Sequence, residues 1–213
     1  MRNNDVIQTG RSADLVTLEL LVGGALVPDT VHIQSVIVHR EVNRIPYAKI
    51  TLLDGDAPGR DFPLSNEETF LPGNEIEILA GYHSDNSRLF KGVIVNHRLR
   101  IRDANQQLLI ECRDSAYKMT QGRNSAYFYE QSDGELMETL ILKHGLKAEA
   151  ESIDYVHPEL IQYQCSDWDF LVTRAQANGK VVRVEDGTVY VSKPDVFSGS
   201  IGDSDVWRQY IGI

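Results

Sequence analysis

The stretch 164–179 (QCSDWDFLVTRAQANG) carries a helix start, an apolar stripe and a helix stop in register. Ser166 can accept a hydrogen bond from the backbone N–H of Asp169, whose carboxylate lies where the helix dipole favours negative charge. Apolar side chains then recur at helical spacing, at Trp168, Leu171, Val172 and Ala175. Asn178 and Gly179 tolerate a left-handed stop. The stretch predicts one buried helix of about three turns, with a structural role.

A second helix start lies earlier in the chain, at residues 132–135 (SDGE), which form another capping box. Side chains at helical spacing follow before Gly145 ends the run, at Leu136, Leu140, Ile141 and His144. In the segment between the two helices we expect a short strand at 159–163. Beyond the second helix, residues 181–184 and 188–191 flank Asp186-Gly187, a sequence typical of a type I′ hairpin turn. These features predict a small α+β domain.

Between residues 15 and 114 the chain reads as short strands rich in Val and Ile, separated by turn residues. The firm segments are 31–42, 47–53, 75–82, 89–102 and 107–113. Regular turn spacing in an all-β unit favours a barrel or a sandwich. Around Ser35 the apolar positions change parity, which a β-bulge would explain.

The predicted fold class is therefore α+β. An N-terminal antiparallel β-barrel, a tube-like domain, is expected at residues 1–118. A small α+β domain with two helices and a β-hairpin is expected at 119–195, and an exit segment at 196–213. No internal repeat is expected.

One predicted strand alternates two apolar side chains with three arginines: Leu99, Ile101, Arg98, Arg100 and Arg102. Alternation of this kind gives one apolar face and one cationic face. The ordinary interpretation is a solvated face, and the alternatives are a charged subunit interface or a channel wall. The turn residues 103–106 join this strand to 107–113 in a long hairpin.

The net charge of −10 over 213 residues argues against nucleic acid or an anionic membrane surface as the main partner. The first residues lack the apolar region of a signal peptide, so we expect neither secretion by that route nor a membrane span. Cys112 and Cys165 are isolated, which fits a reducing, cytoplasmic compartment. The apolar groups near the end of the chain indicate a fragment or an interface.

Catalytic and ligand-binding patterns are absent from the sequence, so we expect no catalytic residues, no metal and no cofactor. The six histidines form no metal-binding pair, and no phosphate-binding glycine loop or nucleophile elbow occurs. Cys165 precedes a helix cap, and His144 or His157 could approach it, but a buried structural cysteine is the preferred interpretation. Asp167 and Asp169 are explained by the helix dipole. An interaction protein is the default reading.

Five short motifs, in order, give the chain a family resemblance. They are 71–78 (LPGNEIEI), 81–82 (GY), 89–94 (LFKGVI), 111–120 (ECRDSAYKMT) and 166–179 (SDWDFLVTRAQANG). Together they resemble the N-terminal hub region of VgrG proteins, which are type VI secretion spike proteins similar to phage tail hubs. The resemblance covers roughly residues 15 to 195.

The resemblance implies a structural hub without enzymatic activity, which joins a tail tube to a membrane-puncturing spike. Family hubs are trimers with two tube-like barrels per chain, so the resemblance implies that 1–118 is the first barrel and that 196–213 is an exit segment toward a missing second barrel. The implied partners are further copies of the chain, the tail tube protein, the spike with its OB-fold region, and baseplate proteins. The implied place is the cytoplasm, in an apparatus later delivered outward, with no membrane contact in the resting state.

The expected site residues are structural. Phe90 and Ile94 are expected inside the barrel or at its seam, and Arg98, Arg100 and Arg102 on a polar face. Three further side chains are expected to anchor the second helix: Trp168, Phe170 and Leu171. The alternative function is a phage-tail carbohydrate-binding module or cell-envelope hydrolase, for which Glu111 and Asp114 are the candidate carboxylates.

Overall fold

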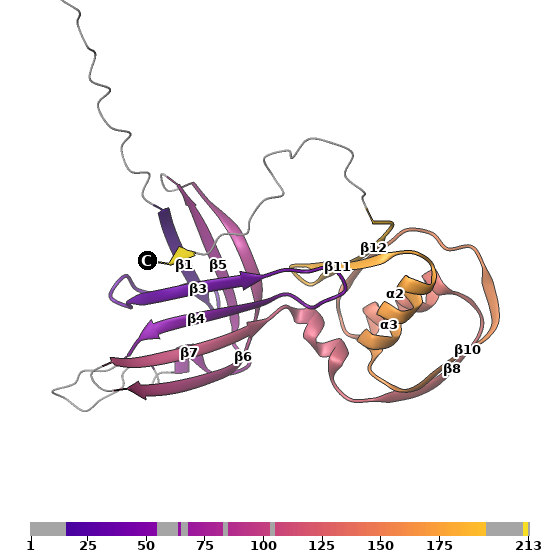
Figure 1. Cartoon of the computed structure of the whole chain (residues 1–213), viewed down its shortest axis with the longest axis horizontal. Coiled ribbons are helices and arrows are strands. Elements are labelled where there is room, and N and C mark those ends of the chain that lie inside the picture. The colour runs from indigo at the N-terminus through magenta and orange to yellow at the C-terminus, as the bar shows by residue number, and fades with distance from the viewer. Residues whose placement is uncertain are drawn as a thin grey trace, which may run out of the picture.

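The computed structural model describes residues 16–54, 64, 68–82, 85–102, 105–194 and 211–212. Strands dominate this part of the chain and two α-helices accompany them, which confirms the α+β class (Figure 1). The strands are β1 (Val16–Val22), β2 (Ala25–Leu26), β3 (Ile33–His39), β4 (Tyr47–Leu53), β5 (Glu75–Tyr82), β6 (Asp85–Arg102), β7 (Asn105–Arg113), β8 (Asn124–Ser132), β9 (Lys147–Ala150), β10 (Val156–Cys165), β11 (Val181–Glu185), β12 (Thr188–Ser192) and β13 (Ile211–Gly212). The helices are α2 (Asp133–Lys143) and α3 (Asp167–Ala177), with the short 3-10 helices η1 (Glu68–Phe70) and η2 (Ser115–Thr120).

Eight strands form one antiparallel sheet in the order β13-β3-β4-β7-β6-β5-β1-β2. β6 is 18 residues long, and its first half pairs with β5 while its second half pairs with β7. A register shift between Ile94 and Asn96 accompanies the change of partner. The sheet curves strongly, so that β1 and β5 cross the direction of β3 and β4 (Figure 1).

The closed barrel stays a prediction, because the described strands leave the sheet open. The outer strands β2 and β13 do not pair with each other. β2 has only two residues, and β13 covers the edge of β3 only at Ser35 and Val36. A pocket of about 260 Å³ with a mixed polar and apolar lining lies beside β1, lined by residues that include Leu18, Glu19, Asp29 and His32.

Three local predictions are confirmed. The β3–β4 register shifts between Ile33 and Ser35, where the change of parity predicted a bulge. β6 and β7 form the long hairpin, although residues 103 and 104 of its turn lie outside the described part. β11 and β12 form the predicted hairpin, whose turn residues Asp186 and Gly187 both have positive φ.

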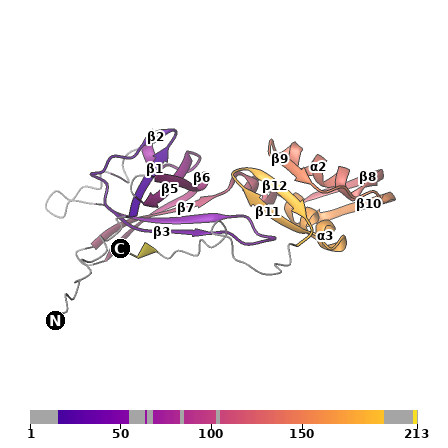
Figure 2. The ribbon, with the colours of Figure 1, turned by 90° about the horizontal axis from the view of Figure 1, so that it is seen from above.

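The described buried hydrophobic residues form two clusters. The first belongs to the eight-stranded sheet, and its largest fully buried members include Leu20, Ile50, Ile78, Phe90, Ile94 and Ile110. Figure 2 shows this sheet beside the part of the chain that carries the helices. β6 contributes residues to the sheet on both sides of its bend. This one strand therefore connects the two parts of the first core.

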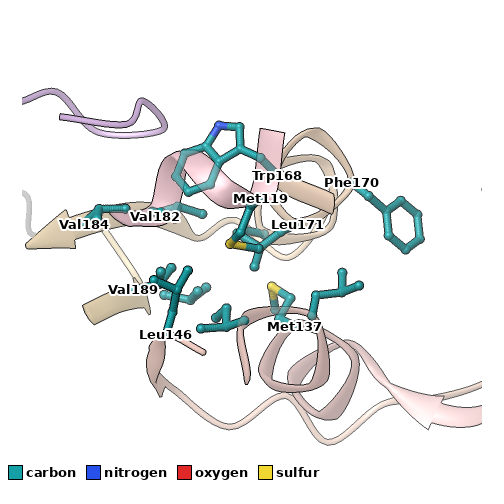
Figure 3. Packing of buried hydrophobic residues seen from close by; sticks show 14 of the residues in the cluster. Met119, Met137, Leu146, Trp168, Phe170, Leu171, Val182, Val184 and Val189 are labelled. Atoms are coloured by element: carbon teal, nitrogen blue, oxygen red, sulfur yellow. The ribbon is translucent and has the colours of Figure 1, made fainter. Parts of the chain in front are cut away.

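The second cluster packs α2 and α3 against β9, β11, β12 and the two-stranded ribbon of β8 and β10. Trp168 and Leu171 lie near Met119 of η2 (Figure 3). Phe170 projects to another side of α3, where its ring stacks with that of Phe128 at a centroid distance of 6.1 Å. The helix therefore packs on two sides.

Both helices begin and end as predicted. Ser166 Oγ accepts from the Asp169 backbone N–H at 3.0 Å, and Ser132 forms the complete capping box with Glu135. Gly145 and Gly179 follow the C-terminal caps with φ of 70° and 63°. The capping residues thus set where each helix begins and ends, to within one residue.

Within the α+β part, sequence reasoning missed two strands and predicted only the middle of a third, and β1 and β2 of the large sheet also lie outside the strand segments named from the sequence. β8 and β9 were not predicted, and the short strand predicted at 159–163 is the middle of β10. Most of the predicted exit segment, 196–213, lies outside the described residues. Its described part, β13, pairs with β3.

Candidate functional site

Asp133, the first residue of α2, is almost fully buried and fully hydrogen-bonded. Arg174 of α3 donates to it from Nε at 2.5 Å and from Nη2 at 2.7 Å. Asn178, the C-cap of α3, donates from Nδ2 at 2.8 Å, and His157 Nε2 lies 3.0 Å away. One carboxylate thus joins α2, α3 and β10.

Asp167, the first residue of α3, has a matching set of contacts. Lys143 Nζ and His144 Nε2, at the end of α2, lie 2.9 Å and 2.8 Å from Oδ2. Gln162 and Asn124 each donate an amide N–H to Oδ1 at 2.8 Å. The two helices are therefore tied reciprocally, each holding the first carboxylate of the other.

These contacts keep both carboxylates ionised. Burial alone would raise the pKa of Asp133, but hydrogen bonds from Arg174 and Asn178 outweigh it and lower the pKa to about 2. Burial opposes ionisation of Asp167 too, and hydrogen bonds from Gln162 and His144 lower its pKa well below the usual range. Because these oxygens already accept several hydrogen bonds, the two groups are structural.

The reciprocal contacts reflect an internal repeat, β8-α2-β9 followed by β10-α3-β11. Five pairs of residues, each thirty-four positions apart, have the same role in both halves: Glu130 and Gln164, Ser132 and Ser166, Asp133 and Asp167, Thr139 and Thr173, Gly145 and Gly179. In this order they are a left-handed strand residue, an N-cap, a buried first-turn carboxylate, a hydroxyl bonded to the carbonyl four residues back, and a left-handed glycine.

The prediction that the chain has no internal repeat is therefore wrong. The shared signal was present in the sequence as S-D-x-[DE], a threonine and a glycine at equal spacing, and 34 residues lies within the range of known repeats. Three buried apolar positions of α2 also recur in α3, at Leu136 and Phe170, Met137 and Leu171, and Ile141 and Ala175, but the residue type differs within each pair.

The candidate carboxylates of the hydrolase alternative do not form a site. Asp114 is buried, caps η2 by accepting from the Ala116 N–H at 2.9 Å, and accepts from the Gly187 N–H at 3.1 Å. Burial raises its pKa, and these two backbone hydrogen bonds oppose the rise. Glu111 is half-buried on β7, where its carboxylate lies 3.8 Å from Arg98. Each group has separate structural partners.

The described residues give no support for a metal site or for a cysteine activated by histidine. They contain no group of three or more His, Cys, Asp and Glu side chains placed to hold a metal ion. His144 and His157, the two candidates to activate Cys165, bond to aspartates. No helix in the described part is long and apolar enough to cross a membrane.

The structure places the predicted site residues on three different features. Phe90 and Ile94 are buried in the first cluster. Arg98 and Arg100 are exposed on β6, and the side chain of Arg102 lies outside the described residues. The three residues expected to anchor α3 all belong to the second cluster: Trp168, Phe170 and Leu171.

Sequence reasoning missed the junction between the sheet and the second cluster. Asn43, in the β3–β4 connection, donates its backbone N–H to the Val182 carbonyl at 2.7 Å, and its Oδ1 accepts from the Val182 N–H at 2.8 Å. Its positive φ of 60° allows this approach. Ile45, two residues further on, is part of the second cluster.

The turn of the β11–β12 hairpin makes the other half of the junction. Arg88 of β6 lies 2.8 Å from the carboxylate of Asp186, and Arg40 lies 3.2 Å from that of Glu185. The Asp114 contact with Gly187 lies in the same region. The hairpin turn is thus held by charged groups from three parts of the sheet and its connections.

The outer face of the β8–β10 ribbon exposes large apolar side chains. Tyr127, Tyr129, Ile161 and Tyr163 are 62%, 62%, 52% and 77% exposed. Phe128 and Leu160, from the opposite face, pack into the second cluster. A half-solvated sheet normally presents polar side chains outward, so this face is unusual.

Comparisons with known proteins place the chain in a family. The profile of the Alg8 N-terminal domain family matches residues 12–203, which is most of the chain. A comparison with curated proteins found no match.

Solved structures share the fold at low sequence identity. The 43 kDa tail protein of prophage MuSo2 from Shewanella oneidensis aligns with a TM-score of 0.62 and 9% identity, covering 84% of this chain and 53% of that one. A tail protein from Neisseria meningitidis gives 0.60 and 14%, over 83% and 50% of the two chains. A type VI secretion component of E. coli gives 0.57 and 15%, over 80% and 48%.

The chain thus spans about half the length of these proteins. A chain of the Francisella PdpA–VgrG complex also aligns, with a TM-score of 0.56. The chain belongs to the Alg8 N-terminal domain family, and its fold is that of VgrG and phage tail hub-like proteins.

Proposed function

We propose that the chain is part of the structural hub of a contractile injection machine, of the type VI secretion or phage-tail kind, where it joins the tail tube to the membrane-puncturing spike. The observation that carries the proposal is the shared fold. It extends over 80% or more of this chain in two tail proteins and in a type VI secretion component.

The internal chemistry of the chain supports a role without catalysis. The described part of the chain has four buried carboxylates that all accept hydrogen bonds, those of Asp54, Asp114, Asp133 and Asp167. Catalytic carboxylates need free oxygens that converge on a substrate. A scaffold that transmits force between a tube and a spike needs well-tied elements instead.

In this proposal the chain has a sheet domain at 1–118 and an α+β domain at 119–195. The two separate hydrophobic clusters support such a division. The open edges of the eight-stranded sheet would close into a tube-like barrel on assembly, since closure removes unpaired backbone groups. Three copies would form the hub, together with the tail tube protein, the spike and its OB-fold region, and baseplate proteins.

The proposed hub would assemble in the cytoplasm and travel outward on contraction. Its test is the mass of the full-length gene product, measured by light scattering alone and with the tail tube protein of the same gene cluster. We expect a trimer that co-elutes with the tube protein. A monomer that does not bind the tube protein would contradict the proposal. The matched control is an unrelated tube protein from another injection system.

A further inference from the structure

The outer face of the β8–β10 ribbon has the composition of a binding surface. Its exposed aromatic side chains are not needed by the core, because the alternate residues of both strands fill it. The rings of Tyr127 and Tyr129 stack on each other with centroids 6.4 Å apart. Stacking holds these rings in place before any partner binds. The side chains therefore lose less conformational entropy on binding.

The internal repeat places a tyrosine on this face twice. Tyr129 and Tyr163 occupy equivalent positions, and each directly precedes a left-handed residue, Glu130 with φ 50° and Gln164 with φ 49°. Both tyrosines are exposed. The tyrosine thus recurs at a position where packing does not require it, which indicates a role outside the fold.

Two exposed glutamates adjoin Tyr129, one in the chain and one across the strand register. Glu130 follows Tyr129 directly, and Glu159 is opposite Tyr129 in the strand register. Both are exposed, and within the described part of the chain neither forms an ion pair. The face is therefore aromatic and acidic, and the group that best complements it is a guanidinium, which can stack on tyrosine and pair with carboxylate.

The chain carries such groups on β6. Arg98 and Arg100 are exposed on one face of this strand, and Arg98 has only a 3.8 Å contact with Glu111. Arg100 has no ion-pair partner among the residues that the structure describes. The chain already stacks arginine on tyrosine elsewhere, since Arg183 lies 4.2 Å from the ring centroid of Tyr190.

The two surfaces cannot meet within one chain. The second half of β6 and the β8–β10 ribbon lie at opposite ends of the molecule (Figures 1 and 2). We propose that the tyrosine face of the β8–β10 ribbon in one copy docks on the Arg98–Arg100 face of β6 in a second copy. Because the two faces differ, the contact is head-to-tail, and a pair of copies retains one free tyrosine face and one free arginine face for further neighbours.

This inference rests on the proposed function only in that a hub contains several copies of the chain. Its test uses the 213-residue chain without a tube protein, so failure of the contact and failure of tube binding are distinguishable. The measurement is sedimentation velocity from about 10 µM to 1 mM chain, at low and high salt. We expect association that weakens as salt rises, because exposed charges are screened.

Two charge-reversed variants give the decisive comparison. Arg98→Glu with Arg100→Glu makes both faces acidic, and Glu130→Arg with Glu159→Arg makes both faces basic. For each variant alone, the dissociation constant of the association should be at least about tenfold higher than for the natural chain. An equimolar mixture of the two should associate again, because each acidic face then meets a basic one.

A control variant separates the contact from net charge. Lys118→Glu with Lys147→Glu changes the net charge as much as the arginine variant does, at exposed positions away from both faces, and should associate like the natural chain. Circular dichroism checks that every variant is folded. A natural chain that stays monomeric throughout, an arginine variant that associates normally, or a mixture that stays dissociated would each overturn the proposal.

Discussion

Arg174 of α3 donates two hydrogen bonds to Asp133 of α2, from Nε to Oδ1 at 2.5 Å and from Nη2 to Oδ2 at 2.7 Å. Asp133 is 1% exposed and Arg174 has a partly buried side chain, so both groups have lost much of their hydration. The pair ties the last turn of one helix to the first residue of the other. A buried pair of this kind is costly to break from one side.

Replacing Arg174 with Ala should lower the free energy of unfolding by about 3 to 5 kcal/mol, because it leaves the Asp133 carboxylate buried without its main partner. Urea denaturation measures the loss. Arg123→Ala is the matched control, since Arg123 is exposed and makes no hydrogen bond or ion pair with a described residue; it should change the stability by less than about 0.5 kcal/mol. Equal effects of the two changes would argue against the role of the pair.

The Asp133 carboxylate should also make stability depend on pH. Its pKa is lowered from 3.8 to about 2, so its contribution is present above pH 3.8 and is lost as pH falls through 2. Asp133→Asn removes this titration. The stability difference between the natural chain and Asp133→Asn should therefore shrink between pH 4 and pH 2, and a difference that stays constant in denaturant melts would contradict the assignment.

Trp168→Ala should cost about 3 to 5 kcal/mol, as for large-to-small changes in a core. Trp168 is 6% exposed in the second cluster. Tyr163→Ala is a useful comparison, because it removes an aromatic ring that is 77% exposed and should cost little. A loss below about 1 kcal/mol for Trp168→Ala in denaturant melts would exclude the anchoring role.

Gly92→Ala should disrupt the bend of β6. A Cβ at this position would lie 2.2 Å from the Arg113 carbonyl oxygen, so the β6–β7 backbone would have to move apart, at a cost of several kcal/mol (about 3 or more). Gly134→Ala is the control, since its Cβ would meet only atoms at 3.5 Å or beyond. In the first turn of α2 this change should be neutral or stabilising by up to about 1 kcal/mol. Thermal melts that rank the two variants in the opposite order would refute this reading of β6.

The features predicted well from sequence are those that local chemistry fixes. Caps at Ser132 and Ser166, the glycine stops, and the Asp186-Gly187 turn each follow from one or two residues and their immediate neighbours. The bulge at Ser35 was visible because a change of parity is recorded in the sequence itself. These signals need no knowledge of the tertiary structure.

The features that were missed depend on distant partners. β8 has aromatic residues on both faces, and its alternation gives no polar side to mark it as a strand. β9 is only four residues long and pairs in parallel with β12, which lies some forty residues further on. The helix dipole explains why Asp167 lies in the first turn of α3. The hydrogen bonds that Lys143 and Gln162 donate to it could not be predicted from the spacing of residues in the sequence.

The most direct test of the proposed role is the position of the chain in an assembled machine. Electron cryomicroscopy of the intact apparatus, with the gene product in place, should show the eight-stranded sheet of this chain at the end of the tail tube, with the α+β part beside it. Density at that end that fits no copy of this fold, in particles shown by mass spectrometry to contain the chain, would contradict the account.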